Sequence, residues 1–173
     1  ELVQTSATSG TLLVGEQNPI APIVWQFRAA APRGLGILYD SGQRLLSGRT
    51  YDVALGDLDA DGDLDAFITH DFTDAAIWLN DGAGKFHQSN QSLSGLEEAS
   101  VALGDLDHDG DLDAFITRRN DRPSAVLLND GHGHFTDTLQ GLGHADSLDA
   151  ALGDLDRDGD LDAFVANGYD NQP

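Results

Sequence analysis

The sequence predicts an all-β fold: blades of four antiparallel strands, about three blades' worth of a β-propeller that is larger than this chain or is completed by oligomerisation. A block of 15 residues occurs three times, at offsets of 48 and 49 residues. Short apolar runs between turn residues have the length of strands, and helix signals are nearly absent. Four-stranded units of about 45 to 50 residues that pack face to face form the blades of a propeller.

The repeated block covers residues 53–67, and its copies cover residues 101–115 and 150–164. Downstream of the first two copies lies a second shared block, residues 78–86 and 127–135, which contains Asn-Asp-Gly. Such self-similarity at a nearly fixed period indicates one structural unit repeated along the chain.

Each complete unit is predicted to contain four short strands. In the first unit, residues 53–55, 66–69 and 76–79 form three strands, and the stretch around Phe86 forms the fourth. Asn-Asp-Gly between the third and fourth strands favours a tight hairpin turn. Because runs such as Ala-Phe-Ile do not alternate between polar and apolar residues, we expect these strands to be covered on both faces.

The chain, 1–173, is predicted to be one repeat domain in four parts. The first part lacks the aspartate-rich segment, but Trp25 can take the place of Trp78 and residues 12–14 the place of a second strand. The parts are a partial blade without the aspartate loop at 11–50, blades at 51–99 and 100–148, and a partial blade with the loop at 149–173. Because a propeller needs at least about four blades, either the chain is a piece of a longer protein, or other copies or partner chains complete the ring.

Five aspartates occupy alternate positions in each copy of the block, with a glycine inside the run. Counted from the first aspartate, positions 1, 3, 5 and 9 can supply side-chain ligands and position 7 a backbone carbonyl, while glycine at position 6 permits a sharp turn around an ion. The predicted metal residues are Asp57, Asp59, Asp61, Asp63, Asp65, Asp105, Asp107, Asp109, Asp111, Asp113, Asp154, Asp156, Asp158, Asp160 and Asp162.

These ligands predict three calcium sites. Hard oxygen donors in a flexible loop favour Ca²⁺ over zinc or copper, and over Mg²⁺, which prefers a rigid octahedron with several waters. The loop begins like an EF-hand, but position 12 is Ile68, Ile116 or Val165 instead of glutamate, so the ninth aspartate must close the site. Five like charges in one hairpin repel one another unless a cation compensates them.

The segment Asp-x-Asp-x-Asp-Gly-x-Leu-Asp, with Gly before it and Ala-Phe after it, resembles the calcium-binding FG-GAP/VCBS repeat of integrin alpha subunits and many secreted bacterial proteins. The resemblance covers almost all of residues 11–167. It implies integrin-alpha-like propeller blades in which the aspartate loop joins the first two strands, and recognition by loops on the propeller faces. The loops that differ between repeats are 69–75, 90–100, 117–125 and 139–147.

The charge balance excludes two classes of partner. The chain has 30 acidic and 9 basic residues and a net charge of −21, and Lys85 is its single lysine, so it offers no basic patch to nucleic acid or to an anionic membrane. No apolar run approaches the roughly 18 residues of a membrane span, which argues against direct membrane insertion. The absence of cysteine excludes thiolate metal sites and disulfides.

Two further clusters allow alternative interpretations. His132 and His134 lie in the hairpin turn of the second complete unit, where they either bind a transition metal or are solvated. Arg118, Arg119 and Arg122 concentrate positive charge between the second and third strands of that unit, where they either bind an anionic glycan or an acidic partner or are solvated.

The sequence contains no Ser-His-Asp order, nucleophile elbow, phosphate loop or catalytic carboxylate pair apart from the repeat, so no enzyme activity is predicted. The predicted function is that of a secreted, extracellular calcium-binding propeller segment, at the cell surface or in the periplasm. It would act as a non-enzymatic scaffold for cell adhesion, ligand binding or assembly, with protein or glycan partners. The alternative is an accessory propeller domain of a secreted enzyme, or a lectin.

Overall fold

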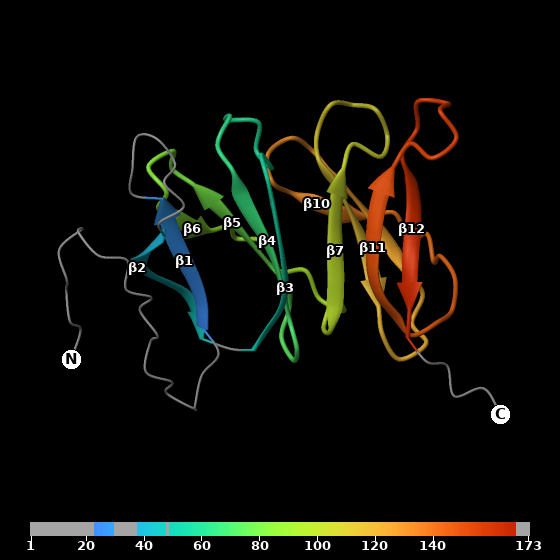
Figure 1. Ribbon diagram of the computed structural model, residues 1–173, viewed down its shortest axis with the longest axis horizontal. Coiled ribbons are helices and arrows are strands. Elements are labelled where there is room, and N and C mark those ends of the chain that lie inside the picture. Colours follow the sequence, from blue (N-terminus) through green and yellow to red (C-terminus); the bar gives the residue numbers. More distant parts are fainter. Residues whose placement is uncertain (1–22, 30–37, 48, 169–173) are drawn as a thin grey trace.

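The computed structural model describes residues 23–29, 38–47 and 49–168 (Figure 1), so the strand expected at residues 12–14 lies outside the described residues, as does the side chain of Trp25. Within the described residues the secondary structure consists of strands and turns, and no helix is long and apolar enough to cross a membrane. The strands are β1 (Ile23–Ala29), β2 (Leu38–Ser47), β3 (Thr50–Gly56), β4 (Asp65–His70), β5 (Ala76–Asn80), β6 (Phe86–Gln88), β7 (Ala99–Gly104), β8 (Asp113–Arg118), β9 (Ala125–Asn129), β10 (Phe135–Asp137), β11 (Ser147–Gly153) and β12 (Asp162–Asn167).

The strands form two four-stranded sheets and two two-stranded sheets. In β3–β4–β5–β6 and β7–β8–β9–β10, each strand pairs antiparallel with the next one along the chain. β1 pairs with β2, and β11 pairs with β12, also antiparallel. The all-β prediction is confirmed, and the four-stranded sheets are propeller-like blades; below, β3–β6 is the first blade, β7–β10 the second blade and β11–β12 the half-blade.

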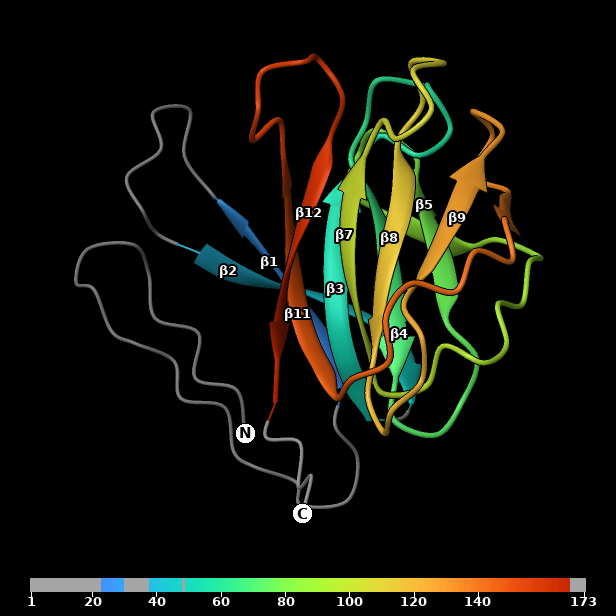
Figure 2. The same ribbon diagram turned by 90° about the vertical axis from the view of Figure 1, so that its right-hand side faces the viewer.

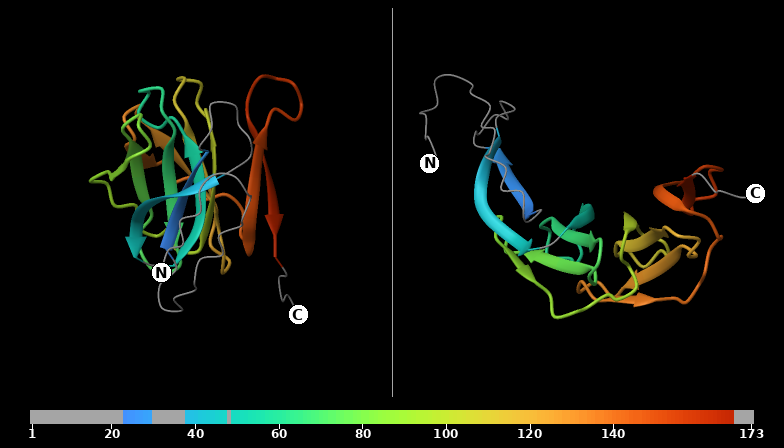
Figure 3. Two further views of the ribbon diagram at one scale, coloured as in Figure 1. Left: turned by 60° about the vertical axis from the view of Figure 1, so that its left-hand side comes forward. Right: turned by 90° about the horizontal axis from the view of Figure 1, so that it is seen from below.

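The sheets stand side by side along an arc whose ends do not meet, which is clearest from below (Figure 3, right). The first strands β3, β7 and β11 are neighbours in this arc. The connections β3–β4, β7–β8 and β11–β12, which carry the aspartates, protrude from the same end of the molecule (Figures 1 and 2). An open arc of this kind fits a segment of a larger propeller.

The main core lies between the two blades. Phe67 of β4 is fully buried, and its ring meets the ring of Phe135 in β10 edge-on, with the centroids 5.2 Å apart. Leu58, Ile77 and Leu127 belong to the same buried cluster. Because this cluster draws side chains from both sheets, its burial holds one blade against the next.

Glycines at the ends of the first strands let neighbouring blades approach closely. A Cβ atom on Gly56 would lie 2.6 Å from Cδ1 of Leu112, and a Cβ atom on Gly104 would lie 2.7 Å from Cδ1 of Leu161. Leu112 in the aspartate loop of the second blade therefore packs over Gly56 of the first blade. Leu161 in the aspartate loop of the half-blade packs over Gly104 of the second blade in the same way.

The half-blade has the same sequence pattern, but among the described residues a neighbouring sheet packs against one of its sides only. Phe164 is 71% exposed, whereas Phe67 and Phe115 at the equivalent positions are 0% and 5% exposed. Leu155 is likewise 64% exposed, against 0% for Leu58. The expectation that the strands are covered on both faces is confirmed for β4, in which every residue is buried, and is wrong for β12, because no further described sheet packs against it.

The β1–β2 pair covers the outer half of the first blade on the opposite side, where Leu45 packs against its buried residues. The side-chain amide of Gln43 donates to a hairpin carbonyl at 2.6 Å and accepts from the backbone N–H of Phe86 at 3.0 Å. Gln91 makes a similar pair of bonds with the backbone of Phe135, at 2.6 and 2.9 Å. These glutamines therefore tie the β1–β2 pair to the outer hairpin of the first blade, and the first blade to the outer hairpin of the second blade.

Candidate metal sites

Each aspartate loop joins the first strand of a sheet to the second. We name residues 57–65 loop 1, residues 105–113 loop 2 and residues 154–162 loop 3. Loops 1 and 2 belong to the two blades, and loop 3 belongs to the half-blade. Position numbers below count from the first aspartate of each loop.

Left-handed backbone at two positions curls each loop. The glycine at position 6 has φ of 92° in loop 1, 97° in loop 2 and 99° in loop 3, a conformation that L side chains rarely adopt. Position 4 is also left-handed, with φ of 59° at Ala60, 64° at His108 and 69° at Arg157. This turn brings carboxylates of alternate residues toward a common centre.

Three carboxylates converge in each loop, with one oxygen of each residue within 4.8 Å of those of the other two. Positions 1 and 3 belong to all three groups, whereas the third member is position 5 in loop 1 and position 9 in loops 2 and 3. The groups are Asp57, Asp59 and Asp61; Asp105, Asp107 and Asp113; and Asp154, Asp156 and Asp162. The predicted metal residues outside these groups are Asp63, Asp65, Asp109, Asp111, Asp158 and Asp160.

The aspartate at position 1 is oriented by the backbone of its own loop. In loop 1, Asp57 Oδ1 accepts a hydrogen bond from the N–H of Asp61 at 3.1 Å, and Oδ2 accepts one from the N–H of Gly62 at 3.0 Å. Asp105 and Asp154 likewise accept from the glycine N–H at position 6, at 3.2 and 3.3 Å. The loop backbone thus holds this carboxylate in place before a metal ion binds.

The aspartate at position 9 ties the loop to the rest of the blade. Asp65 is fully buried, and its two carboxylate oxygens accept from the N–H groups of Leu58 at 2.9 Å and Asn80 at 2.8 Å. Asp113 makes the equivalent bonds at 2.8 and 2.9 Å. In the half-blade, Asp162 makes the bond within its own loop at 2.9 Å, but the described residues contain no third strand to supply the other.

The aspartate at position 7 directs its side chain toward the outer hairpin. A Cβ atom on Gly82 would lie 2.5 Å from Asp63 Oδ2, and a Cβ atom on Gly131 would lie 2.5 Å from Asp111 Oδ2. The glycine of Asn-Asp-Gly therefore leaves room for this side chain. This placement is consistent with a role for position 7 through its backbone carbonyl.

Two loops hold buried carboxylate oxygens that have no hydrogen-bond partner among the described residues, Asp59 Oδ1 and Asp105 Oδ1. An unpartnered buried oxygen of this kind is costly, and a bound cation would compensate it. Burial, with a smaller contribution from the other loop aspartates, raises the pKa of Asp59, Asp65 and Asp113 above the ordinary value. The donors are all hard oxygens, so the residues present fit Ca²⁺.

The two histidines of the second outer hairpin do not belong to a metal-ligand group in the described part of the chain. His132 and His134 are both exposed, and their backbone N–H groups donate to Asp130 Oδ1 at 3.0 and 3.4 Å. The alternative of a solvated turn accounts for these positions, and transition-metal binding stays an untested prediction.

The arginine cluster lies among acidic side chains of the same chain. Because each guanidinium already faces a carboxylate, the positive charge available to an external anion is reduced. Anion binding by this loop also stays an untested prediction. The ion-pair distances from Arg118, Arg119 and Arg122 to the carboxylate oxygens of Asp137, Asp146 and Glu97 are 4.0, 3.4 and 3.3 Å respectively.

Sequence reasoning missed the asparagines that brace the loops. The side-chain amide of Asn80 donates to Leu64 O at 3.2 Å, and that of Asn129 donates to Leu112 O at 3.2 Å and to Leu58 O at 2.9 Å. The signal was present in the repeat, because Asn-Asp-Gly follows both loops at a similar distance. By its turn propensity the motif predicts a hairpin, and only the structure shows that its asparagine also supports the aspartate loop.

The fold and the loops define a β-propeller-like repeat protein with candidate metal sites. The sequence matches the family described as FG-GAP-like repeat over residues 57–116 and 105–165, which together make up more than half of the chain. The chain therefore belongs to the FG-GAP-like repeat family, as its resemblance to FG-GAP/VCBS repeats predicted. No curated protein matches the chain.

Proposed function

We propose that this protein is an extracellular, calcium-stabilised propeller segment that acts as a non-enzymatic scaffold for adhesion, ligand binding or assembly. The observation that carries the proposal is the convergence of three carboxylates in each of three repeated loops. Two of these loops contain a buried carboxylate oxygen without a hydrogen-bond partner in the described part of the chain. Extracellular modules often bind Ca²⁺ with dissociation constants of about 0.1 to 1 mM, which suits an extracellular or periplasmic setting.

The calcium would have a structural role. Each candidate site takes its carboxylates from one loop, which leaves little room for a substrate to coordinate. Bound Ca²⁺ would supply the positive charge that offsets the repulsion among the aspartates, while the loop backbone and the ninth aspartate hold the carboxylates in place. Since an ion bound to the folded loop is lost on unfolding, its binding free energy adds to stability.

Partner recognition is proposed for the loops at the end opposite the aspartate loops. The second strand of each sheet leaves the aspartate loop and ends at the other side, so the loops after β4 and β8 lie there. Phe72, in the loop after β4, is 73% exposed. Leu139, in the loop after β10, is 88% exposed. Exposed large apolar side chains in loops that differ between repeats suit protein or glycan contacts better than a purely structural role.

The test is native mass spectrometry from calcium-containing buffer, combined with thermal unfolding with and without EDTA. Three Ca²⁺ ions per chain and a lower melting temperature in EDTA are expected. Absence of retained calcium together with an unchanged melting temperature would overturn the proposal. The same spectrum gives the number of chains per particle, which separates a propeller completed by other copies from one completed within a longer chain.

A further inference from the structure

We propose that His108 is a positioning residue that couples loop 2 to loop 3, so that these two calcium sites do not bind independently. The inference deepens the proposed function and rests on it, because it concerns how one candidate calcium loop supports the next. It assigns a role to a side chain that is outside both groups of converging carboxylates.

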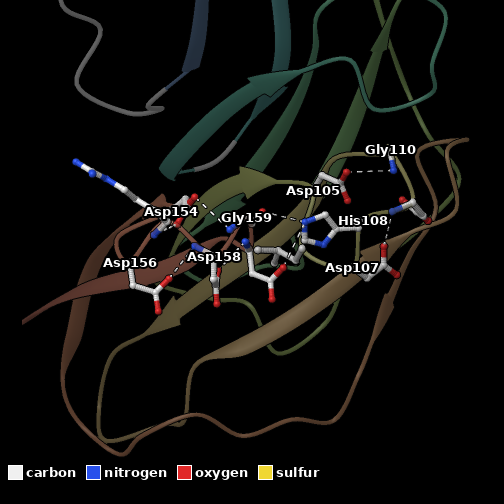
Figure 4. Close-up of polar contacts among 12 residues, drawn as sticks. Asp105, Asp107, His108, Gly110, Asp154, Asp156, Asp158 and Gly159 are labelled. Atoms are coloured by element: carbon white, nitrogen blue, oxygen red, sulfur yellow. Dashed lines mark hydrogen bonds and ion pairs between the residues drawn. The ribbon is translucent and has the colours of Figure 1, made fainter.

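His108 crosses from one loop to the next. It occupies position 4 of loop 2, and its ring points toward loop 3, where Nε2 lies 3.1 Å from the carbonyl oxygen of Gly159 (Figure 4). A carbonyl oxygen only accepts, so Nε2 carries the hydrogen and donates it. Asp160 Oδ1 lies 3.6 Å from the same nitrogen. Because the neutral ring with hydrogen on Nε2 suffices for this bond, the link does not depend on a charged histidine.

The bond reaches a peptide group that orients a predicted ligand. The carbonyl of Gly159 and the N–H of Asp160 belong to one peptide plane, and that N–H donates to Asp158 Oδ1 at 2.9 Å. Asp158 is at position 5 of loop 3, and the backbone carbonyl predicted to bind calcium belongs to Asp160. By holding this plane, His108 restrains the N–H group that orients the carboxylate of Asp158, a predicted ligand in the neighbouring loop.

The other loops supply natural comparisons. Position 4 has the same left-handed backbone in all three loops, but in loop 1 it is Ala60, which has no side chain to reach loop 2. In loop 3 it is Arg157, whose side chain makes no hydrogen bond or ion pair with the described residues. The coupling through a histidine is therefore expected between loops 2 and 3. Loops 1 and 2 are linked in a different way, by the amide of Asn129, which donates to Leu58 O of loop 1 and to Leu112 O of loop 2.

The test is a calcium titration followed by NMR, using the amide signals of the three position-6 glycines, Gly62, Gly110 and Gly159, as one reporter for each loop. His108→Ala should weaken calcium binding by loop 3 about two- to five-fold, as expected for the loss of one hydrogen bond. Binding by loop 1 should not change. The matched control is Arg157→Lys, which keeps the positive charge of loop 3 and should leave all three affinities unchanged, because the Arg157 side chain makes no hydrogen bond or ion pair with the described residues.

A double-mutant cycle then separates coupling from a purely local effect. Asp107→Asn, which removes charge from loop 2, should weaken loop 3 when His108 is present and should have no effect on loop 3 in the His108→Ala background. Unchanged loop 3 affinity in His108→Ala would overturn the inference while leaving the proposed function intact. If none of the three glycine signals of the unmodified protein responds to calcium, the proposed function fails, and the inference fails with it.

Discussion

The first blade and the half-blade carry nearly the same repeat, but their equivalent side chains have opposite surroundings. Phe67 and Leu58 are fully buried in the first blade, while Phe164 and Leu155 are mostly exposed in the half-blade. The local strand pairing is the same, because β3–β4 and β11–β12 have corresponding registers. The difference teaches that the repeat fixes strand pairing and loop shape, whereas burial depends on whether another sheet packs alongside.

The largest expected effect distinguishes the two phenylalanines. Phe67→Ala should lower the free energy of unfolding by about 3 to 5 kcal/mol, because it removes a fully buried ring and leaves a cavity between the blades. Phe164→Ala should change it by no more than about 0.5 kcal/mol, as for other surface substitutions. Urea denaturation in calcium-containing buffer measures both. Equal losses would mean that the exposed face of the half-blade is covered in solution.

A smaller effect is expected at the glycines before the loops. Gly56→Ala should destabilise by about 1 to 3 kcal/mol, since the added Cβ atom would overlap the side chain of Leu112 in a packed interface. Gly153→Ala should be nearly neutral, because no heavy atom lies within 4 Å of the corresponding position. Thermal unfolding of the two variants measures both effects. If Gly153→Ala lowered the melting temperature as much as Gly56→Ala, Gly153 would not face open space.

The calcium affinity of the aspartate loop should be lower in the half-blade than in the second blade. Asp113 is anchored by two backbone N–H groups and Asp162 by one, so we expect loop 3 to bind Ca²⁺ about ten-fold more weakly than loop 2. Isothermal titration calorimetry should resolve a weak site, and Asp107→Ala should remove one of the stronger sites. Three equal affinities in the unmodified protein would show that the bond to the third strand does not matter.

The smallest expected effect is the contribution of His70, in the first blade, to the pH dependence of stability. Burial lowers the pKa of His70 below its ordinary value of 6.5. Below that pH, His70 therefore binds a proton more readily in the unfolded chain than in the folded chain. Above pH 6.5 His70 is neutral in both states and does not lower the free energy of unfolding. As the pH decreases below 6.5, the free energy of unfolding decreases. The half-blade has Asn167 at the equivalent position, which makes His70→Asn the natural control.

The measurement for His70 is the free energy of unfolding at pH 7.5 and 5.5 in saturating calcium, for the unmodified protein and for His70→Asn. The decrease between the two pH values should be smaller in His70→Asn. An identical decrease in both proteins would place the pH sensitivity in another group.

Much of the fold could be predicted because the signals are local. Alternating aspartates with glycine at position 6 specify a turn, since the left-handed backbone at Gly62, Gly110 and Gly159 excludes most other residues. Asn-Asp-Gly specifies the outer hairpins, and the spacing between motifs specifies the number of strands in each unit. Each of these features acts over a few neighbouring residues, so reading it required no tertiary contacts.

The loop chemistry was also predictable, but the composition of each carboxylate group was not. All three loops present the same five aspartates, yet position 5 joins the group in loop 1 and position 9 joins it in loops 2 and 3. Anchoring of the ninth aspartate does not explain this difference, because Asp65 and Asp113 accept equivalent pairs of backbone hydrogen bonds, and Asp162 joins its group with one of these bonds.

By itself, the sequence determined that this protein is a repeat of four-stranded units with three aspartate loops, because strand length, turn type and ligand spacing are encoded within each unit. Only the tertiary structure decided that Phe164 is exposed while Phe67 is buried, that Leu112 covers Gly56, and that His108 reaches Gly159. These are contacts between units about 48 residues apart in the chain. Their formation depends on the distance and angle between neighbouring sheets, which no single repeat contains.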